Sequence, residues 1–169
     1  MSATNSTSGG RDVASHPSVQ RVRATLADLG ITDRIRTLDA STRTAREAAD
    51  ALGVEVGQIA SSLLFLADGT PVLVVASGAY RVDTARLADV LGAQDITKPN
   101  ADEVRAATGF AIGGVAPIGH PQPLRIVIDK SLAGYDEVWA AGGHPYAVFR
   151  STFDELLAIT AAEVVDVQQ

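Results

Sequence analysis

The sequence contains no cysteine among its 169 residues, so neither disulfide bonds nor thiolate chemistry can contribute to stability or function. It also lacks an apolar run near the roughly 18 residues that span a bilayer. Residues 1–15 are rich in Ser, Thr and Gly and hold no apolar stretch, which argues against a secretory signal. We therefore expect a disordered tail over residues 1–15, one domain over residues 16–169, a cytoplasmic location and no membrane partner.

Several motifs of known chemistry are also missing. No GxGxxG follows a predicted strand and no GxxxxGK[ST] occurs, so the usual nucleotide-binding loops are not supported. No serine stands in Gly-x-Ser-x-Gly, the turn that activates hydrolase serines. His120 and His144 could be metal ligands, but a third ligand at diagnostic spacing is missing. We therefore expect neither a metal nor a cofactor.

The net charge of −6 is unevenly distributed along the chain. Residues 51–169 hold seven basic and fourteen acidic residues, whereas residues 1–50 hold seven arginines and six acids. A protein of this charge does not bind nucleic acid through a broad basic surface, and we expect no DNA partner. A local contact with RNA would involve the arginine-rich first third, although these arginines can equally be ordinary solvated residues.

The hydrophobic pattern predicts alternating helices and strands without a strict βαβ rhythm. The helices are predicted over residues 17–29, 45–52, 84–91 and 101–108 and from residue 153, and the strands over residues 34–38, 59–66, 71–76, 93–98, 124–129, 137–141, 146–150 and 164–167. Pairs of capping residues support three of the helix starts: Thr44 with Glu47, Asn100 with Glu103, and Thr152 with Glu155. This order predicts an α/β (mixed α+β) single domain, with a central mixed β-sheet surrounded by helices.

The most distinctive stretch is Gly-Gly-Val-Ala-Pro-Ile-Gly-His at residues 113–120, within a predicted loop over residues 110–123. Glycine lets the backbone approach a ligand closely, and Pro117 stiffens the turn by fixing φ. Such a loop can present N–H groups to a carbonyl or carboxylate oxygen. On the residues alone, a glycine-rich connection between a helix and a strand explains the stretch as well.

A few polar side chains could act beside this loop. His120 and His144 each stand in Gly-His-Pro and are predicted to lie in loops, where they could serve as general base and hydrogen-bond donor or have no role. Ser61 and Ser62 lie on one predicted strand, so one of them should face inward. Either serine could equally be a small residue tolerated in a strand.

Together these segments resemble, in order, the YbaK/ProX family of aminoacyl-tRNA deacylases, which includes the editing insertion domain of bacterial prolyl-tRNA synthetases. The resemblance covers nearly all of residues 16–167. The matching pieces are the helix at 19–29, Ala-Ala-Asp-Ala-Leu-Gly-Val at 48–54, Gln-Ile-Ala-Ser-Ser-Leu-Leu-Phe at 58–65, Thr-Gly-Phe-Ala-Ile-Gly-Gly-Val-Ala-Pro-Ile-Gly-His at 108–120, and Ala-Gly-Gly-His at 141–144. The segment from Gly113 to Pro117 is the most specific of them.

The resemblance implies a trans-acting domain that hydrolyses the ester of mischarged tRNA. Its partner would be the 3′ end of aminoacyl-tRNA, with a synthetase as a further candidate. The residues implied for catalysis are Ser61, Gly113, Gly114 and His120, and those implied for substrate binding are Val115, Ala116, Pro117, Gly143 and His144. Backbone groups of the loop would hold the substrate and position a water against the ester.

Two positions depart from the family pattern. The family usually has a lysine where Ser61 stands, and a serine supplies neither its charge nor its reach. Some members carry an acid where Val148 stands. The alternative expectation is therefore a non-catalytic homologue that keeps the pocket and binds a tRNA 3′ end, an amino acid or a partner protein.

Overall fold

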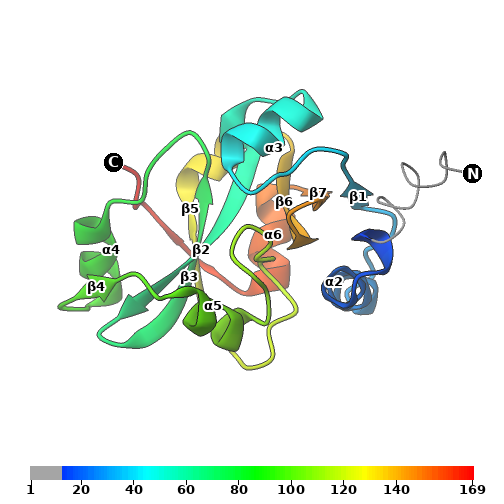
Figure 1. Ribbon diagram of the computed structural model, residues 1–169. Coiled ribbons are helices and arrows are strands. Elements are labelled where there is room, and N and C mark those ends of the chain that lie inside the picture. The colour runs from blue at the N-terminus through cyan, green and yellow to red at the C-terminus, as the bar shows by residue number, and fades with distance from the viewer. Residues whose placement is uncertain (1–12) are drawn as a thin grey trace, which may run out of the picture.

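Eight strands form one mixed sheet at the centre of the molecule, and helices pack around it (Figure 1). The computed structural model describes residues 13–169. Most of the predicted tail, residues 1–12, lies outside the described residues, whereas residues 13–15 are helical. The predicted fold class is confirmed.

The sheet mixes parallel and antiparallel pairs. Its strand order is β1 (Ile35–Thr37), β7 (Ala147–Ser151), β6 (Val138–His144), β2 (Ile59–Ala67), β3 (Thr70–Ser77), β5 (Arg125–Asp129) and β8 (Glu163–Val165), with β4 (Ile96–Thr97) paired to the far end of β2. Strand β2 is antiparallel to β3 and β4 but parallel to β6. Asp68 and Gly69, both with positive φ, make the hairpin turn between β2 and β3.

One edge of β2 is open over part of its length. Its pairing with β6 covers only Ile59 and Ala60, and its pairing with β4 covers only Leu66 and Ala67. Between them, residues 61–65 have no strand partner on this edge within the described chain. Because β6 and β4 do not meet, the sheet is split beside these residues.

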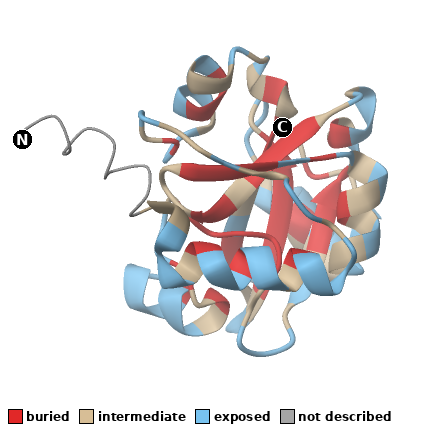
Figure 2. Cartoon of the chain, turned by 90° about the vertical axis from the view of Figure 1, so that its right-hand side faces the viewer, coloured by how far each residue is buried: buried red, intermediate tan, exposed pale blue. Residues whose placement is uncertain are grey.

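The helices cover the sheet with apolar side chains. They are α2 (Pro17–Asp28), α3 (Ala45–Leu52), α4 (Thr84–Leu91), α5 (Ala101–Thr108) and α6 (Phe153–Thr160), with 3-10 helices η1 (Val56–Gln58) and η2 (Lys130–Gly134). Val19, Val22 and Leu26, spaced three and four residues apart, form the buried face of α2, whereas Leu29 at its C-cap is exposed. Buried residues follow the strands and the inner faces of the helices (Figure 2). Within residues 13–169, no helix has the length and hydropathy needed to cross a bilayer.

Side chains of the predicted type begin the helices on either side of the split. Thr44 and Glu47 exchange side-chain and backbone hydrogen bonds, and so do Asn100 and Glu103. Capping of this kind stabilises a helix by about 1 kcal/mol. Thr152 also caps α6, but the Glu155 carboxylate binds Arg34 instead of completing a reciprocal pair.

Three predicted boundaries are wrong. The predicted strand over residues 93–98 pairs only at Ile96–Thr97, and the last strand is Glu163–Val165 instead of 164–167. The predicted loop over residues 142–145 is mostly strand, because β6 continues to His144 through a bulge. Gly143, with φ +97°, allows that bulge, since a glycine adopts positive φ without steric cost.

Candidate functional site

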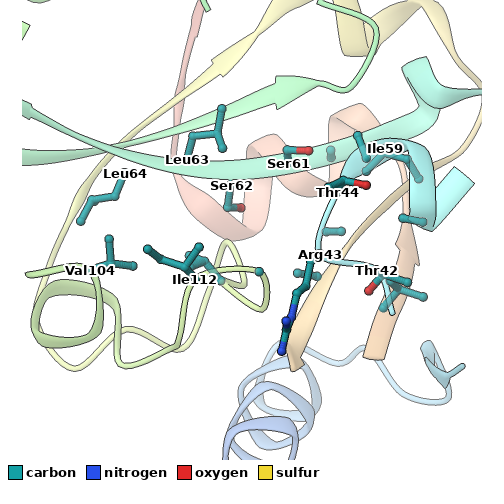
Figure 3. Close-up of a pocket in the computed structure, with 18 of the residues that line it drawn as sticks. Thr42, Arg43, Thr44, Ile59, Ser61, Ser62, Leu63, Leu64, Val104 and Ile112 are labelled. Carbon is teal, nitrogen blue, oxygen red and sulfur yellow. The ribbon is translucent and has the colours of Figure 1, made fainter. Parts of the chain in front are cut away.

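A pocket of about 450 Å³ opens where the edge of β2 is unpaired (Figure 3). Its walls come from β2, β6, the segment before α3, the segment before α5 and the glycine-rich loop. The lining includes apolar side chains and four hydroxyls, and its two charged residues are both cations. The polar and charged residues that line it are Thr42, Arg43, Thr44, Ser61, Ser62 and Lys98.

The two serines lie on opposite faces of β2, as alternation along a strand requires. Ser62 and Leu64 extend toward α5 and the glycine-rich loop, whereas Ser61 and Leu63 lie on the other side of the strand (Figure 3). Leu64 joins the same core cluster as Val104 of α5. Both serines nevertheless line the pocket, because it wraps around the open edge of β2.

The Ser62 hydroxyl is buried without a hydrogen-bond partner among the described residues. The buried hydroxyl of Ser77 on β3, by contrast, donates to the Gly57 carbonyl at 2.8 Å. An unpaired buried hydroxyl costs about 1–3 kcal/mol. A polar group bound in the pocket would restore the missing hydrogen bond of Ser62.

Two glycines of the loop make room for neighbouring protein groups. A Cβ on Gly113, where φ is +93°, would lie 2.9 Å from Cγ of Arg43. A Cβ on Gly114 would lie 2.9 Å from the backbone N of His144. The loop is therefore packed directly against the end of β6 and against the Arg43 side chain.

The amide groups of the loop differ in their availability. The N–H of Gly114 donates to the Ala111 carbonyl at 3.0 Å. The N–H groups of Gly113 and Val115 have no acceptor elsewhere in residues 13–169, and both residues line the pocket. Backbone N–H groups without an acceptor stabilise an oxyanion where they point at one oxygen atom.

His120 fixes the far end of the loop. Its Nε2 lies 2.8 Å from the Ala116 carbonyl oxygen, and its ring stands edge-on to Phe110. Arg21 of α2 lies over the same Phe110 ring, 4.4 Å from its centroid, and donates to the Gly109 carbonyl. Burial lowers the pKa of His120, so its ring is neutral near pH 7 and Nε2 can donate to Ala116.

His144 lies on the other side of the loop, at the end of β6. Its ring is 5.0 Å from that of His16 and 5.8 Å from that of Tyr146 between centroids. Burial lowers the pKa of His144, and the positive charges of His16 and Arg43 lower it further. No group of three or more His, Asp or Glu side chains that could hold a metal gathers in the described part of the chain.

Comparison with known proteins identifies the family of this domain. A family model for the aminoacyl-tRNA editing domain matches residues 39–159, a range that contains the pocket and the loop. The chain belongs to the aminoacyl-tRNA editing domain family. The open edge of β2 and the loop at residues 113–120 both lie within the matched range.

Both isolated and fused relatives of this editing domain are known. The uncharacterised protein YwhH of Bacillus subtilis (strain 168) is 30% identical over 87% of this chain and 94% of its own length. A proline–tRNA ligase of Lactobacillus acidophilus is 31% identical over 66% of this chain, which spans about 20% of that ligase. A solved structure of a candidate trans-editing enzyme for prolyl-tRNA synthetase is 47% identical, with a TM-score of 0.85 over 90% of this chain and 98% of the other.

The pocket brings together only some of the site residues predicted from sequence. Ser61, Gly113 and Val115 line it. The other predicted residues support the loop or lie behind it, and their roles in catalysis and binding stay predictions. The residues predicted for the site that do not line the pocket are Gly114, Ala116, Pro117, His120, Gly143 and His144.

The sequence analysis missed the two cations of the pocket. Arg43 directly precedes Thr44, and Lys98 stands two residues before Asn100. Both N-caps were predicted from their capping pairs, so their neighbours could have been recognised as residues at helix starts. The starts of α3 and α5 face one pocket because β6 and β4 are separated along β2. No local sequence pattern reveals that separation.

Proposed function

We propose that this editing domain hydrolyses the ester of mischarged aminoacyl-tRNA, acting in trans. The observation that carries the proposal is that Gly113 and Val115 both line the pocket and that their N–H groups have no acceptor within residues 13–169. The relation to YwhH, which matches over nearly its whole length, supports a domain that works as a separate protein. The cytoplasm, where charged tRNA is found, is the compartment that this function requires.

The nucleophile in this proposal is water. The described residues that line the pocket include no His, Cys, Asp or Glu, so the usual partner of a catalytic serine is missing there. An aminoacyl ester is already activated, and a positioned water with a stabilised oxyanion suffices to cleave it. The water oxygen bonds to the carbonyl carbon, the bond to the ribose oxygen breaks, and that oxygen takes up a proton. The products are a free amino acid and uncharged tRNA.

Different residues around the pocket would contribute to different parts of the reaction. The amides of Gly113 and Val115 would bind the oxygen that becomes negative in the transition state. The unpaired Ser62 hydroxyl would hydrogen-bond to the water or to a polar group of the aminoacyl moiety. The apolar lining would hold the amino-acid side chain, and the volume of the pocket would limit its size. His120 would act indirectly, by holding the Ala116 carbonyl and hence the loop.

The second candidate function is a binding protein without hydrolase activity. It is favoured by Ser61, which lines the pocket where the family has a lysine. Such a protein would keep the pocket and bind a tRNA 3′ end, a free amino acid or a partner. Binding of uncharged tRNA without loss of the ester would identify it.

The direct test incubates the purified protein with mischarged tRNAs, such as alanyl- or cysteinyl-tRNA(Pro), and follows loss of the ester. We expect hydrolysis above the rate in buffer. A matched reaction with an active member of the family shows that the substrate is competent. If that reaction proceeds and this protein removes none of the amino acids, the hydrolase proposal is wrong and the binding function takes its place.

A further inference from the structure

Three basic side chains gather where the pocket meets α2. His16 is the N-cap of α2, His144 ends β6, and Arg43 precedes the N-cap of α3. The rings of His16 and His144 are 5.0 Å apart between centroids. Arg43 lines the pocket and is close enough for its charge to act on His144. Three segments distant in the sequence therefore place positive or proton-donating groups side by side.

The hydrogen-bond donors of these side chains are unused. Nδ1 of His16 accepts the N–H of Ser18, and Nδ1 of His144 accepts the N–H of Tyr146, each at 3.1 Å. In the neutral ring the proton must then be on Nε2, which has no partner within residues 13–169 for either histidine. The guanidinium of Arg43 likewise forms no ion pair or hydrogen bond with another described residue.

The position of Arg43 is fixed by its neighbours. The backbone N–H and the hydroxyl of Thr42 both donate to the Pro145 carbonyl, each at 2.6 Å. Thr44, on the other side, caps α3. The stem of Arg43 passes over Gly113, where a Cβ would lie 2.9 Å from Cγ, and the side chain extends away from β2 (Figure 3). The hydrogen bonds of Thr42 and Thr44 thus fix the backbone on either side of Arg43, and the missing Cβ of Gly113 leaves space for the Arg43 side chain.

We propose that Arg43, His144 and His16 form a phosphate-binding site beside the pocket, which holds a phosphate group of the RNA 3′ end. This inference rests on the proposed function for the identity of the ligand. The aminoacylated ribose carries a phosphate on its own 5′ oxygen, so a phosphate lies one nucleoside away from the ester. Arg43 lines the pocket and its charge acts on His144, whose ring lies 5.0 Å from that of His16 between centroids, which matches that arrangement. Arginine and N–H donors are the groups that proteins use to bind phosphate oxygens.

A titration with inorganic phosphate tests the site independently of any enzyme activity. The full chain is titrated while the imidazole signals of its three histidines are followed by NMR. We expect saturable shifts of His16 and His144 and none of His120, whose Nε2 is already bonded to Ala116. We expect Arg43→Gln to abolish the shifts. Equal shifts of all three histidines, or no saturable shift, would overturn the site.

A second arm tests whether the natural phosphate belongs to RNA. The affinity for uncharged tRNA and the deacylation kinetics are measured for Arg43→Gln and for a control of equal charge change, Arg125→Gln, on the remote strand β5. We expect Arg43→Gln to weaken tRNA binding and raise KM about tenfold, with kcat little changed. The slope of log affinity against log salt should fall by about one. Arg125→Gln should change none of these.

The outcomes separate the two proposals. If no ester is cleaved but Arg43→Gln still weakens the binding of uncharged tRNA, the phosphate site stands and only the hydrolase proposal falls. If inorganic phosphate binds but both variants bind tRNA as the parent does, the site takes free phosphate and the assignment to RNA is overturned. If Arg125→Gln weakens binding as much as Arg43→Gln, net charge explains the effect and the local site is refuted.

Discussion

The backbone of Gly114 lies directly against the backbone of His144. A Cβ at Gly114 would come within 2.9 Å of both N and Cα of His144, closer than real Cβ contacts. The position of the glycine-rich loop therefore depends on the position of the end of β6, and the reverse is also true. This contact gives Gly114 a reason to be glycine that does not involve a ligand.

Gly114→Ala should therefore destabilise the protein and disturb the pocket together. We expect the free energy of unfolding to fall by about 1–3 kcal/mol, because the added methyl group meets backbone that cannot rotate away. Gly134→Ala is the matched control, since nothing lies within 4 Å of a Cβ there. That variant should unfold at the parent's temperature or slightly above it. Thermal unfolding of both variants checks the prediction, and equal midpoints would contradict it.

Replacing Ser62 should lower the activity of the protein without lowering its stability. Ser62→Ala removes a buried hydroxyl that is unpaired in the protein, so the free energy of unfolding should not fall, and it should rise by up to the cost of that unpaired group, about 1–3 kcal/mol. Ser77→Ala should cost about 1–3 kcal/mol, because it leaves the Gly57 carbonyl without its donor. Only Ser62→Ala should slow deacylation in a fully folded protein. Denaturant unfolding and single-turnover kinetics measure the two effects, and equal destabilisation by both substitutions would show that Ser62 is already paired.

His120 should make the protein less stable at mildly acidic pH. Burial lowers its pKa in the folded state, so the unfolded chain binds the proton more tightly. The stability from the neutral ring is fully present above the unfolded pKa of about 6.5 and is lost as the pH falls from there toward the lower folded pKa. Below the folded pKa, the His120 contribution no longer changes with pH.

His120→Asn keeps a donor for the Ala116 carbonyl but cannot titrate. The fall in unfolding temperature with decreasing pH should therefore be smaller in this variant than in the parent. Part of the dependence should persist, because the pKa of His144 is lowered as well, by burial first and then by the charges of His16 and Arg43. Unfolding temperatures measured across this pH range for both proteins give the comparison. Identical pH dependence in the two proteins would rule out a contribution from His120.

Local sequence patterns predicted the helix starts well and the pocket only in part. Thr44 with Glu47 and Asn100 with Glu103 act within one helical turn, and both pairs form the predicted bonds. Gly142 and Gly143 lie between the strands predicted over residues 137–141 and 146–150, yet β6 continues through both of them to His144. The pocket exists because β2 pairs with β6 only as far as Ala60. That separation is set by tertiary packing, so the sequence could place Ser61 on a strand but not Arg43 and Lys98 beside it.

The last prediction concerns Ser61, which lines the pocket and stands where the family resemblance implies a lysine. The Ser61 side chain starts on the face of β2 opposite the glycine-rich loop, but it lines the pocket at the open edge of the strand, around which a lysine is long enough to extend (Figure 3). Ser61→Lys should therefore increase the rate of deacylation by at least about tenfold, because a positive charge brought near the ester stabilises the developing oxyanion. Ser61→Met is the control, since it adds comparable length without charge. Single-turnover kinetics on one mischarged tRNA compare the three proteins. An inactive parent with an active Ser61→Lys variant would mean that the domain keeps its pocket and lacks only the lysine. An active parent that the substitution leaves unchanged would show instead that the charge is dispensable and that the amides of Gly113 and Val115 carry the reaction.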